Sequence, residues 1–380
     1  MAQWQHITRV VNILRSLRYS HKEGRVTYFI CDIGEPKRMQ PSAFNEYYLR
    51  QITMPELGIE GQRKLSKGRV AVIGVGGLGS VSSLYLTLAG VGYLRLVDQD
   101  TVELHNLHRQ ALYSRRDLRY PKVEVAAKKL SEINPDVKID TIPENVRRSN
   151  IDSIIEGVDC VVDGLDNMST RYIVNEACTK RGIPYVFGGA LGLEGNVTVF
   201  HPPETPCLEC VLPGLNDEIL PTCSTRGVIG ATPGVIGAIQ ALETIKLLAG
   251  IKGGLKNRLL ICDFRRMDFL TIELAKAEGC RVCQQKVERA TEQKERLVWM
   301  CGRDTVNINP PKPMNINLDE ARKRISSYKV LASSPIILVF EYKGVEVSLF
   351  RQGRLLLKNV KSEEEALTIY NELLRLLELG

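Results

Sequence analysis

The sequence predicts an α/β protein with a Rossmann-like, doubly wound, mainly parallel sheet and a small α+β domain at the C-terminal end. Three observations lead to this prediction. Apolar runs of strand length alternate with helical runs over most of the chain, and a glycine turn joins the first strand to the first helix. From about residue 296 the pattern changes to short strands separated by glycine turns, followed by one long helix. Alternating strands and helices place helices on both faces of a parallel sheet.

The composition is that of a globular protein with a full core. The chain has 380 residues, of which 44% are hydrophobic, and a net charge of +7. Its short basic clusters lack interleaved aromatic residues, which disfavours nucleic-acid binding. No apolar run reaches the roughly 18 residues of a membrane helix, and the basic N-terminal segment lacks the apolar core of a secretion signal. We therefore expect a cytoplasmic protein without a membrane or nucleic-acid partner.

Three segments follow from these patterns. Residues 1–45 are an N-terminal extension, with a candidate strand at 25–33; residues 46–290 form the large α/β domain; and residues 296–380 form the small domain. In the large domain we expect strands at 69–75, 94–98, 138–142, 158–165, 184–190 and 196–202, and helices at 78–90, 122–133, 170–182 and 234–250. Late antiparallel strands are expected at 257–264 and 268–275, three strands within 334–360, and a last helix that Ser362 caps with Glu365 in a capping box.

The glycine turn predicts a nucleotide site. Gly74, Gly76 and Gly79 give the Gly-x-Gly-x-x-Gly pattern, with Gly77 beside them, and Asp98 ends the next strand. Glycines let the backbone approach phosphates, and an acid at this distance binds ribose hydroxyls. By itself this pattern also fits an NAD-dependent oxidoreductase, or glycines that serve only to pack a helix on a strand.

A polar cluster after Asp98 favours a triphosphate. The segment adds Asp100, Asn106, Arg109 and Gln110, all within thirteen residues. An arginine can pair with phosphate oxygens through its fork of donors, and Asn106 can donate to the same oxygens. Lys122, at the head of the next helix, supplies a further cation. Each residue alone could be a solvated charge, but their grouping indicates a phosphate site.

Four cysteines predict a structural zinc site. They form two Cys-x-x-Cys pairs, Cys207 with Cys210 and Cys280 with Cys283. Four thiolates complete a closed tetrahedral Zn²⁺ site and leave no open position for catalysis. The alternative is a coincidence of buried thiols.

Together these motifs resemble the ThiF/MoeB/HesA group, which includes the adenylating domains of ubiquitin-activating enzymes and their prokaryotic sulfur-carrier relatives. The motifs are the glycine turn, residues 97–110, Lys122, residues 162–172 and the two cysteine pairs. The resemblance implies ATP with Mg²⁺ as ligands, and attack of a protein's C-terminal glycine carboxylate on the α-phosphate. The products are an acyl-adenylate and pyrophosphate.

The resemblance also implies roles for single residues. Asp166 would bind Mg²⁺, supported by Asn167 and Arg171, although its position also suits a helix cap. Arg50 would reach the ATP site of a partner subunit, which implies a homodimer; the alternative is an ordinary surface arginine. Two positions depart from the pattern of the relatives: Arg119 replaces a usual glycine before Lys122, and His108 replaces a usual amide residue.

Cys223 precedes a glycine-rich stretch and has Arg226 nearby, a cation that would favour the thiolate. By resemblance it forms a thioester or enters sulfur transfer, or it has a structural role only. The C-terminal unit carries no rhodanese-like cysteine loop. It is expected to dock the carrier protein or a downstream conjugating enzyme or sulfurtransferase, or else to stabilise the fold or a dimer.

The sequence therefore favours an enzyme that activates a small ubiquitin-like or sulfur-carrier protein ending in Gly-Gly, with ATP, Mg²⁺ and Zn²⁺ as cofactors. Thioester formation at Cys223 would follow in a conjugation enzyme. The alternative is a sulfur-carrier adenylyltransferase for molybdopterin, thiamine or tRNA thiolation, without a covalent intermediate. An NAD-dependent oxidoreductase and a non-catalytic scaffold are the remaining alternatives.

Overall fold

The computed structural model describes residues 44, 46–217, 220, 225–285, 297–299, 304–310, 312 and 314–378. These residues lie within one compact unit, 37–380. The candidate strand at 25–33 and the loop with Cys223 lie outside the described residues. No helix in the described part of the chain combines the length and the apolar character needed to cross a bilayer.

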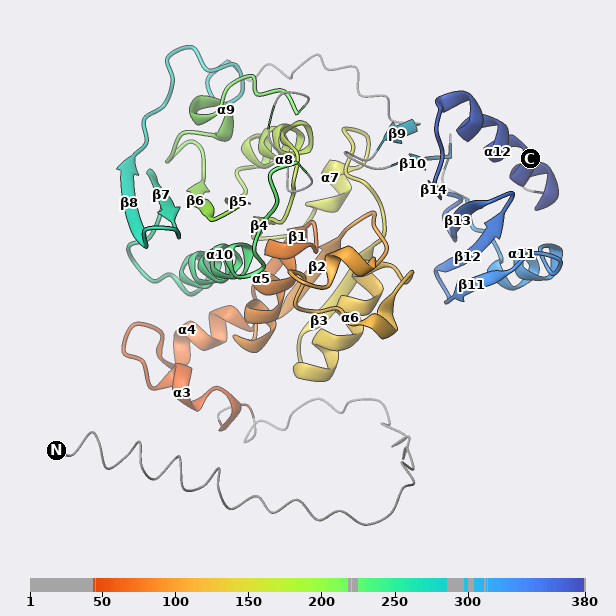
Figure 1. The fold of residues 1–380 in the computed structure, drawn as a ribbon. Coiled ribbons are helices and arrows are strands. Elements are labelled where there is room, and N and C mark those ends of the chain that lie inside the picture. Colours follow the sequence, from red (N-terminus) through yellow and green to blue (C-terminus); the bar gives the residue numbers. More distant parts are fainter. Residues whose placement is uncertain are drawn as a thin grey trace. The chain divides into compact units, whose positions relative to one another are not determined.

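Two sheets organise the fold (Figure 1). The first has eight strands in the order β3-β2-β1-β4-β5-β6-β7-β8, and the second has six in the order β11-β12-β13-β14-β10-β9. Strands of the first sheet are β1 (Arg69–Ile73), β2 (Tyr93–Val97), β3 (Lys138–Ile142), β4 (Cys160–Asp163), β5 (Tyr185–Leu191), β6 (Glu194–Phe200), β7 (Arg258–Asp263) and β8 (Asp268–Glu273). Strands of the second are β9 (Leu297–Trp299), β10 (Thr305–Ile308), β11 (Val330–Ser333), β12 (Ile337–Tyr342), β13 (Val345–Phe350) and β14 (Leu355–Lys358).

The helices occupy the positions that the sequence pattern predicts, with short additions. The described helices are α3 (Leu49–Ile52), α4 (Gly58–Leu65), α5 (Gly77–Leu88), α6 (Lys122–Ile133), α7 (Ile151–Ile154), α8 (Met168–Arg181), α9 (Leu208–Val211), α10 (Ala231–Ala249), α11 (Leu318–Arg324) and α12 (Glu363–Leu376), with 3₁₀ turns η1 (Leu104–Asn106) and η2 (Arg115–Asp117). Gly182 and Gly250 end α8 and α10 in the left-handed conformation, where glycine has no steric penalty.

The first sheet is parallel from β1 to β5 and antiparallel from β5 to β8. The antiparallel part begins because β5 and β6 are joined by a short connection that pairs Leu191 with Glu194, whereas parallel neighbours need a long crossover. The expected Rossmann-like, mainly parallel sheet is confirmed, as is the late antiparallel pair β7 and β8.

Both faces of the central parallel strands are buried, as their strand pattern predicts, whereas β8 at the edge of the sheet is mostly exposed. Alternate residues of β1 enter different cores: Val70 and Val72 pack with α5, α6 and α10, whereas Ala71 and Ile73 pack with α7 and α8. This follows from the two-residue period of a strand. The sheet is thus held between two helical layers, and its carboxyl edge stays open for a site.

The second sheet forms a separate layer with helices on one face. Residues of β12, β13 and β14 pack against α11 and α12 in one core. The opposite face has a smaller core that includes Val339, Phe350 and Leu356, and Tyr120 of the first domain packs against it. Six strands form this sheet, because β9, β10 and β11 join the three expected within 334–360. Ser362 caps α12 by accepting from the Glu365 amide, while the Glu365 carboxylate accepts from the Lys361 amide.

Candidate functional site

Three glycines bring β1, β4 and α5 into close contact. Gly74 has a φ of 87°, and a Cβ there would lie 2.5 Å from the carbonyl oxygen of Gly164. A Cβ at Gly79 would lie 1.8 Å from the carbonyl oxygen of Gly74. Side chains at these positions would therefore push the strand ends and the helix apart. Gly164 was not singled out from the sequence, although it follows an apolar strand as Gly74 does.

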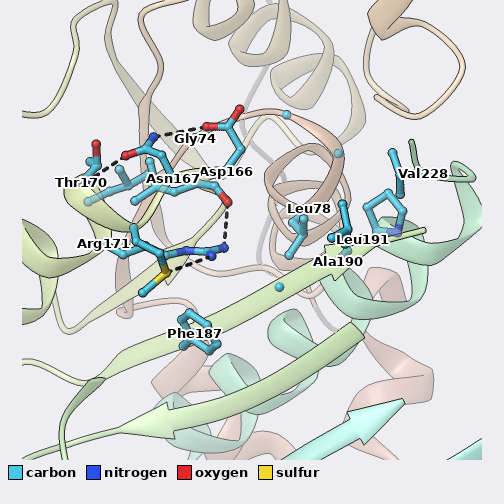
Figure 2. A pocket seen from close by; sticks show the side chains of 18 of the residues that line it. Gly74, Leu78, Asp166, Asn167, Thr170, Arg171, Phe187, Ala190, Leu191 and Val228 are labelled. Atoms are coloured by element: carbon cyan, nitrogen blue, oxygen red, sulfur yellow. Dashed lines mark hydrogen bonds between the residues drawn. The ribbon is translucent and has the colours of Figure 1, made fainter. Parts of the chain in front are cut away.

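A cavity of about 640 Å³ opens beside this turn at the carboxyl ends of the parallel strands (Figure 2). Ligands bind at this edge in open parallel sheets. Predicted site residues that line the cavity are Gly74, Gly76, Gly77, Asp98, Asp100, Arg109, Gln110, Lys122, Asp166, Asn167 and Arg171. Gly79, Asn106 and Arg50 are predicted site residues outside its lining. Residues from five separated segments thus converge on one space.

Asp98 is fixed at the end of β2 by two backbone amides. Its Oδ2 accepts from the amide of Val75 at 2.8 Å, and its Oδ1 accepts from the amide of Asp100 at 2.8 Å. Burial raises the pKa of the Asp98 carboxyl, and the nearby Lys122 cation opposes that shift. The carboxylate is therefore held rigidly beside the glycine turn, where a ribose hydroxyl could donate to it.

Lys122 is a buried cation in the cavity wall. It begins α6 directly after Pro121, its side chain is 5% exposed, and its Nζ donates to Oδ2 of Asp100 at 2.7 Å. Burying an ammonium group is costly unless it is paired and hydrogen-bonded, and Asp100 meets that requirement. The pair places a positive charge and its counter-charge next to the glycine turn.

Arg109 and Asn106 share one loop but have different roles in it. The Nη1 of Arg109 donates to the carbonyl oxygen of His105 at 2.8 Å and lies 2.9 Å from Nε2 of His108. Asn106 is fully buried, and its Oδ1 accepts from the amide of Glu103, which caps the η1 turn. Asn106 therefore helps to shape the loop that presents Arg109; it lies outside the cavity lining, and its contact with phosphate stays a prediction.

Asp166 faces the cavity because its neighbour caps the helix. The Oδ1 of Asn167 accepts from the amide of Thr170 at 2.9 Å and from the hydroxyl of Ser169 at 3.1 Å. The exposed carboxylate of Asp166 contacts the Asn167 amide group at 3.2 Å, as Figure 2 shows. The alternative in which Asp166 serves as the helix cap is thus excluded by the geometry of α8.

Arg171 and Asp163 form a buried polar network behind Asp166. The Nε of Arg171 donates to Oδ2 of Asp163 at 3.0 Å, and Tyr185 donates to the same oxygen at 2.7 Å. Arg171 also lies over the ring of Phe187 (Figure 2). Burial raises the pKa of Asp163, while the Arg171 cation opposes the shift. The sequence shows Asp163 only as an acid that ends an apolar strand, so its role was missed.

Further polar residues enter the cavity from segments that carry no recognised motif. One of them is Asp217, whose carboxylate accepts from the amides of Met168 and Ser169 at the start of α8. The other polar residues of this kind in the lining are Glu144, Asn145, Glu194, Asn196 and Asp263. They lie at the start, inside or at the end of a strand, or in a loop, and a single polar residue in such positions is too common to predict a site.

Arg50 lies away from the cavity of its own chain. It is exposed on α3, a helix that Gln51 fastens to the domain by donating to the carbonyl oxygen of Ala89 at 3.3 Å. An exposed side chain on a docked helix is compatible with contact to a second subunit, which stays a prediction.

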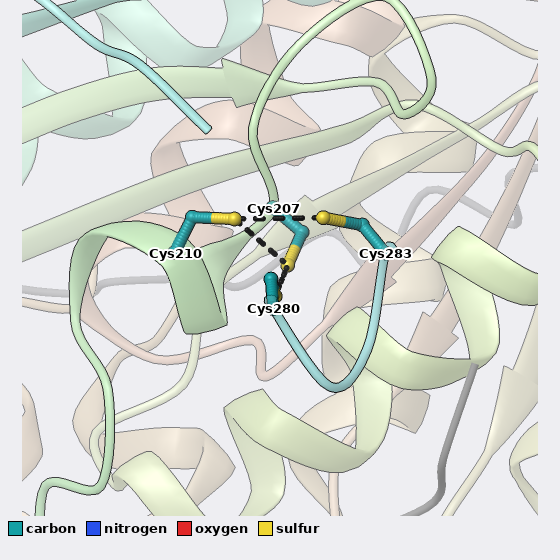
Figure 3. Close-up of side chains that lie close together, drawn as sticks. All are labelled: Cys207, Cys210, Cys280 and Cys283. Atoms are coloured by element: carbon teal, nitrogen blue, oxygen red, sulfur yellow. Dashed lines mark hydrogen bonds between the residues drawn. The ribbon is translucent and has the colours of Figure 1, made fainter. Parts of the chain in front are cut away.

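The four predicted zinc ligands form one cluster (Figure 3). The Sγ–Sγ distances are 3.9 Å for Cys207–Cys210, 3.7 Å for Cys207–Cys280 and 3.5 Å for Cys210–Cys283, and all four sulfur atoms lie within 4.8 Å of one another. Four sulfurs at about 2.3 Å from a tetrahedral zinc ion would be about 3.8 Å apart. The cluster thus has the spacing that a zinc ion requires.

Arg226, the cation expected near Cys223, pairs with Glu194. Its Nη2 donates to Oε1 of Glu194 at 2.8 Å. Cys223 itself lies outside the described residues, so its surroundings stay a prediction.

Comparison with known families and sequences gives one consistent result. A family model described as the ThiF family matches residues 48–282. The chain is 43% identical over 238 residues to the adenylyltransferase and sulfurtransferase MOCS3 of Culex quinquefasciatus, covering 62% of this chain and 54% of that protein. It is 41% identical over 237 residues to the SAMP-activating enzyme E1 of Haloferax volcanii, covering 62% of this chain and 87% of that enzyme. The chain thus spans about half the length of the MOCS3 relative.

Solved structures show the same fold. A crystal structure of E. coli MccB with MccA-N7isoASN superposes with a TM-score of 0.57 and 22% identity, covering 63% of this chain and 74% of that one. A structure of E. coli MccB with ATP gives a TM-score of 0.53, also at 22% identity, and covers 59% of this chain and 69% of that one. At this identity the likeness supports the fold alone.

Proposed function

The chain belongs to the ThiF family, and we propose that it is an adenylyltransferase that activates the C-terminal carboxylate of a small ubiquitin-like or sulfur-carrier protein ending in Gly-Gly. The observation that carries the proposal is the convergence of Arg109, Lys122 and Asp166 on one cavity beside Gly76. The family match favours ATP over NAD as the nucleotide, because only the glycine turn and Asp98 supported NAD.

The proposed reaction brings two anions together. A carboxylate oxygen of the last glycine attacks the α-phosphorus of ATP, a new P–O bond forms, and the bond to the bridging oxygen of the β-phosphate breaks. Pyrophosphate leaves with the electron pair, and the carrier becomes an acyl-adenylate. Charge repulsion and alignment dominate such a barrier, so fixed cations and positioning should carry most of the catalysis.

The residues of the cavity fit these tasks. Asp98 accepts from the ribose, and the backbone of Gly76 and Gly77 lies close to the phosphates at the start of α5. Arg109 and Lys122 neutralise phosphate oxygens. Lys122 already donates to Asp100, so it can neutralise a phosphate oxygen only if the phosphate and Asp100 share its ammonium group.

Asp166 is the proposed Mg²⁺ ligand. It is exposed to the cavity, it is not the cap of α8, and a carboxylate oxygen suits this hard cation. Mg²⁺ bound there would reduce the negative charge of the phosphates. Asn167 and Arg171 support the site by holding the start of α8 and the end of β4.

The cysteine cluster is the proposed structural Zn²⁺ site. Burial raises the pKa of Cys207 and of Cys283, the latter to about 12, so the pair would stay protonated without a nearby cation. A dication would stabilise the thiolates and join α9 to residues 280–283. The four side chains have the number, type and spacing that this metal takes.

Other parts of the proposal concern the whole protein. We propose an extension at 1–45, an adenylation domain at 46–290 and a small domain at 296–380, with Arg50 completing the site of a second copy in a homodimer. An enzyme that uses ATP and reduced cysteines is proposed to act in the cytoplasm. The next step is either a thioester at Cys223 or direct release of the adenylate to sulfur transfer. The names of the MOCS3 relatives include sulfurtransferase, which favours the sulfur-carrier alternative.

Pyrophosphate exchange tests the proposal. Labelled pyrophosphate should enter ATP only when a carrier ending in Gly-Gly is present, and a carrier without its last glycine is the matched control. Exchange that does not depend on any carrier, or tight binding of NADH without binding of ATP, would contradict the proposal.

A further inference from the structure

One fully buried arginine links the second sheet to the cavity. Arg354 directly precedes β14 and is 1% exposed. Its Nη1 donates to Oδ1 of Asn307 at 2.7 Å, its Nη2 donates to the carbonyl oxygen of Gln99 at 2.8 Å, and its guanidinium lies 3.5 Å from the ring centre of Phe350. A buried charge needs such partners. One of these partners, Gln99, belongs to the first domain.

Gln99 lies between the two acids of the nucleotide site. Asp98, Gln99 and Asp100 are consecutive, and all three line the cavity. The Asp98 carboxylate already binds the Asp100 amide at 2.8 Å, and Asp100 binds Lys122. The carbonyl group that accepts from Arg354 is therefore the middle one of three residues. The orientation of this segment determines where the carboxylate of Asp98, the proposed ribose ligand, and the ammonium group of Lys122 lie.

A second contact connects the arginine to the cavity through Asn307. Arg354 binds Asn307, and the Nδ2 atom of Asn307 lies 3.5 Å from the Oδ1 atom of Asn145. Asn145 is buried and lines the cavity. Arg354 thus contacts one cavity segment directly and a second through Asn307.

Ion pairs around the arginine join the same two parts of the chain. Lys358 bonds Thr101 at 3.2 Å and Glu103 at 3.0 Å, and it pairs with Glu346 of its own sheet. Glu346 in turn pairs with Arg119 at 3.0 Å. Arg119 has a φ of 72°, in the left-handed region that favours glycine. Its contact with Glu346 is one interaction that holds the arginine in this conformation.

The charge of Arg354 also acts on the cavity. Burial lowers the pKa of Arg354 to about 9, and Asp100, Glu144 and Asp98 oppose that shift. The group remains a cation at neutral pH and interacts through its charge with Asp98, Asp100 and Glu144, which line the cavity. Its charge therefore favours the ionised form of the carboxyls that the nucleotide site needs.

We propose that Arg354 is a positioning residue for the nucleotide, through which the second sheet holds the Asp98–Asp100 segment in its binding conformation. The inference rests on the proposed function. It gives the second sheet a role in ATP affinity, beside the docking or stabilising role that the sequence left open.

Calorimetric titration of the full-length protein with Mg²⁺-ATP tests the inference. Arg354→Gln should raise the Kd for ATP roughly tenfold or more, because a charged hydrogen bond and its orienting effect are lost. Arg354→Lys keeps the positive charge but lacks the two Nη donors of the guanidinium group, and it should raise the Kd for ATP by a smaller factor. Arg351→Gln is the matched control, since Arg351 is an exposed arginine of the same turn that bonds Asn315, and its Kd should equal that of the wild type.

The outcomes separate the inference from the proposed function. An unchanged ATP affinity in folded Arg354→Gln, even with a lower Tm, would overturn the inference and leave the arginine a structural role only. Wild-type protein that binds ATP but shows no carrier-dependent exchange would contradict the proposed function. In that case the Kd values of the wild type and Arg354→Gln for ATP would still decide the inference. Wild-type protein that does not bind ATP would overturn both.

A second variant covers the case in which Arg354→Gln does not fold. Lys358→Gln removes the outer contact to Thr101 and Glu103 and leaves Arg354 in place. It should weaken ATP binding a few-fold and speed hydrogen exchange of the Asp100 and Thr101 amides. Unchanged affinity together with unchanged exchange at these amides would count against the inference.

Discussion

The Nζ of Lys122 donates to Oδ2 of Asp100 at 2.7 Å, and both side chains lie in the wall of the cavity beside the glycine turn. Lys122 begins α6 and Asp100 follows β2. The pair joins a helix start to a strand end at the edge of the sheet where the sequence predicted a nucleotide.

Replacing Lys122 should impair both stability and ATP binding. Lys122→Ala leaves a largely buried carboxylate at Asp100 without its cation, and breaking a buried pair costs about 3–5 kcal/mol. Lys128→Ala, an exposed lysine on the same helix, is the control and should change neither property. Urea unfolding and ATP titration measure the two effects, and a Lys122→Ala protein with wild-type ATP affinity would contradict the assigned role.

Asp166→Asn should abolish pyrophosphate exchange without lowering stability. The side chain is exposed and does not cap α8, so its loss affects the proposed Mg²⁺ site and not the fold. Asp319→Asn, an exposed acid at the start of α11, is the matched control and should keep full exchange. Residual exchange above roughly a tenth of the wild-type rate in Asp166→Asn would argue against a metal-binding role.

Two glycine-to-alanine substitutions should have different effects on stability, because only one of the two glycines is closely packed. Gly79→Ala should destabilise the protein by about 3 kcal/mol, because its Cβ would lie 1.8 Å from the Gly74 carbonyl oxygen. Gly234→Ala lies in α10 with no atom within 4 Å of the new Cβ, and should be neutral or stabilise by up to about 1 kcal/mol. Equal effects in thermal unfolding would show that the turn is not packed as described.

One zinc ion per chain should be measurable by elemental analysis. Cys280→Ser should lose the metal and lower the Tm, because an ion in the cluster would join α9 to residues 280–283. Cys178→Ala removes a buried thiol outside the cluster; it should lower stability but keep the zinc content. A wild-type protein purified without metal and unaffected by added zinc would contradict this site.

Acid should weaken the contact between the two sheets. Burial alone would raise the pKa of Glu346, but Lys358 and Arg119 hold it below its ordinary value. The stabilising contribution of Glu346 is therefore complete above the unfolded-state pKa of about 4.3 and is lost as the pH falls through the lower folded-state value. Unfolding midpoints measured from pH 6 to 3 should fall more steeply for the wild type than for Glu346→Gln. Parallel curves would contradict this contribution.

Much of the first domain could be predicted from sequence because its signals are local. The alternation of Val70, Ala71, Val72 and Ile73 between two cores follows directly from strand period, and Gly250 ends α10 where the sequence predicted. The glycine turn and the cysteine pairs are recognisable because their chemistry fixes residue type and spacing.

The rest depended on contacts that no local pattern records. Asn106 is adjacent to Arg109 in a polar loop, yet only the fold shows that Asn106 points inward to cap a turn. Arg354 contacts Gln99 across 255 positions of sequence, so its role could not be read from either segment. Arg119 is a departure from the pattern of relatives, and its contact with Glu346 of the second sheet is visible only in the fold.

The fate of an oxygen atom tests the central claim most directly. A carrier whose C-terminal glycine carboxylate is labelled with ¹⁸O is incubated with the protein, Mg²⁺-ATP and hydroxylamine, and the nucleotide product is analysed by mass spectrometry. If the carboxylate attacks the α-phosphorus, hydroxylamine releases the carrier as a hydroxamate and the AMP retains one ¹⁸O atom. Unlabelled AMP, or ADP in its place, would show that the cavity does not join the carrier's carboxylate to the α-phosphate.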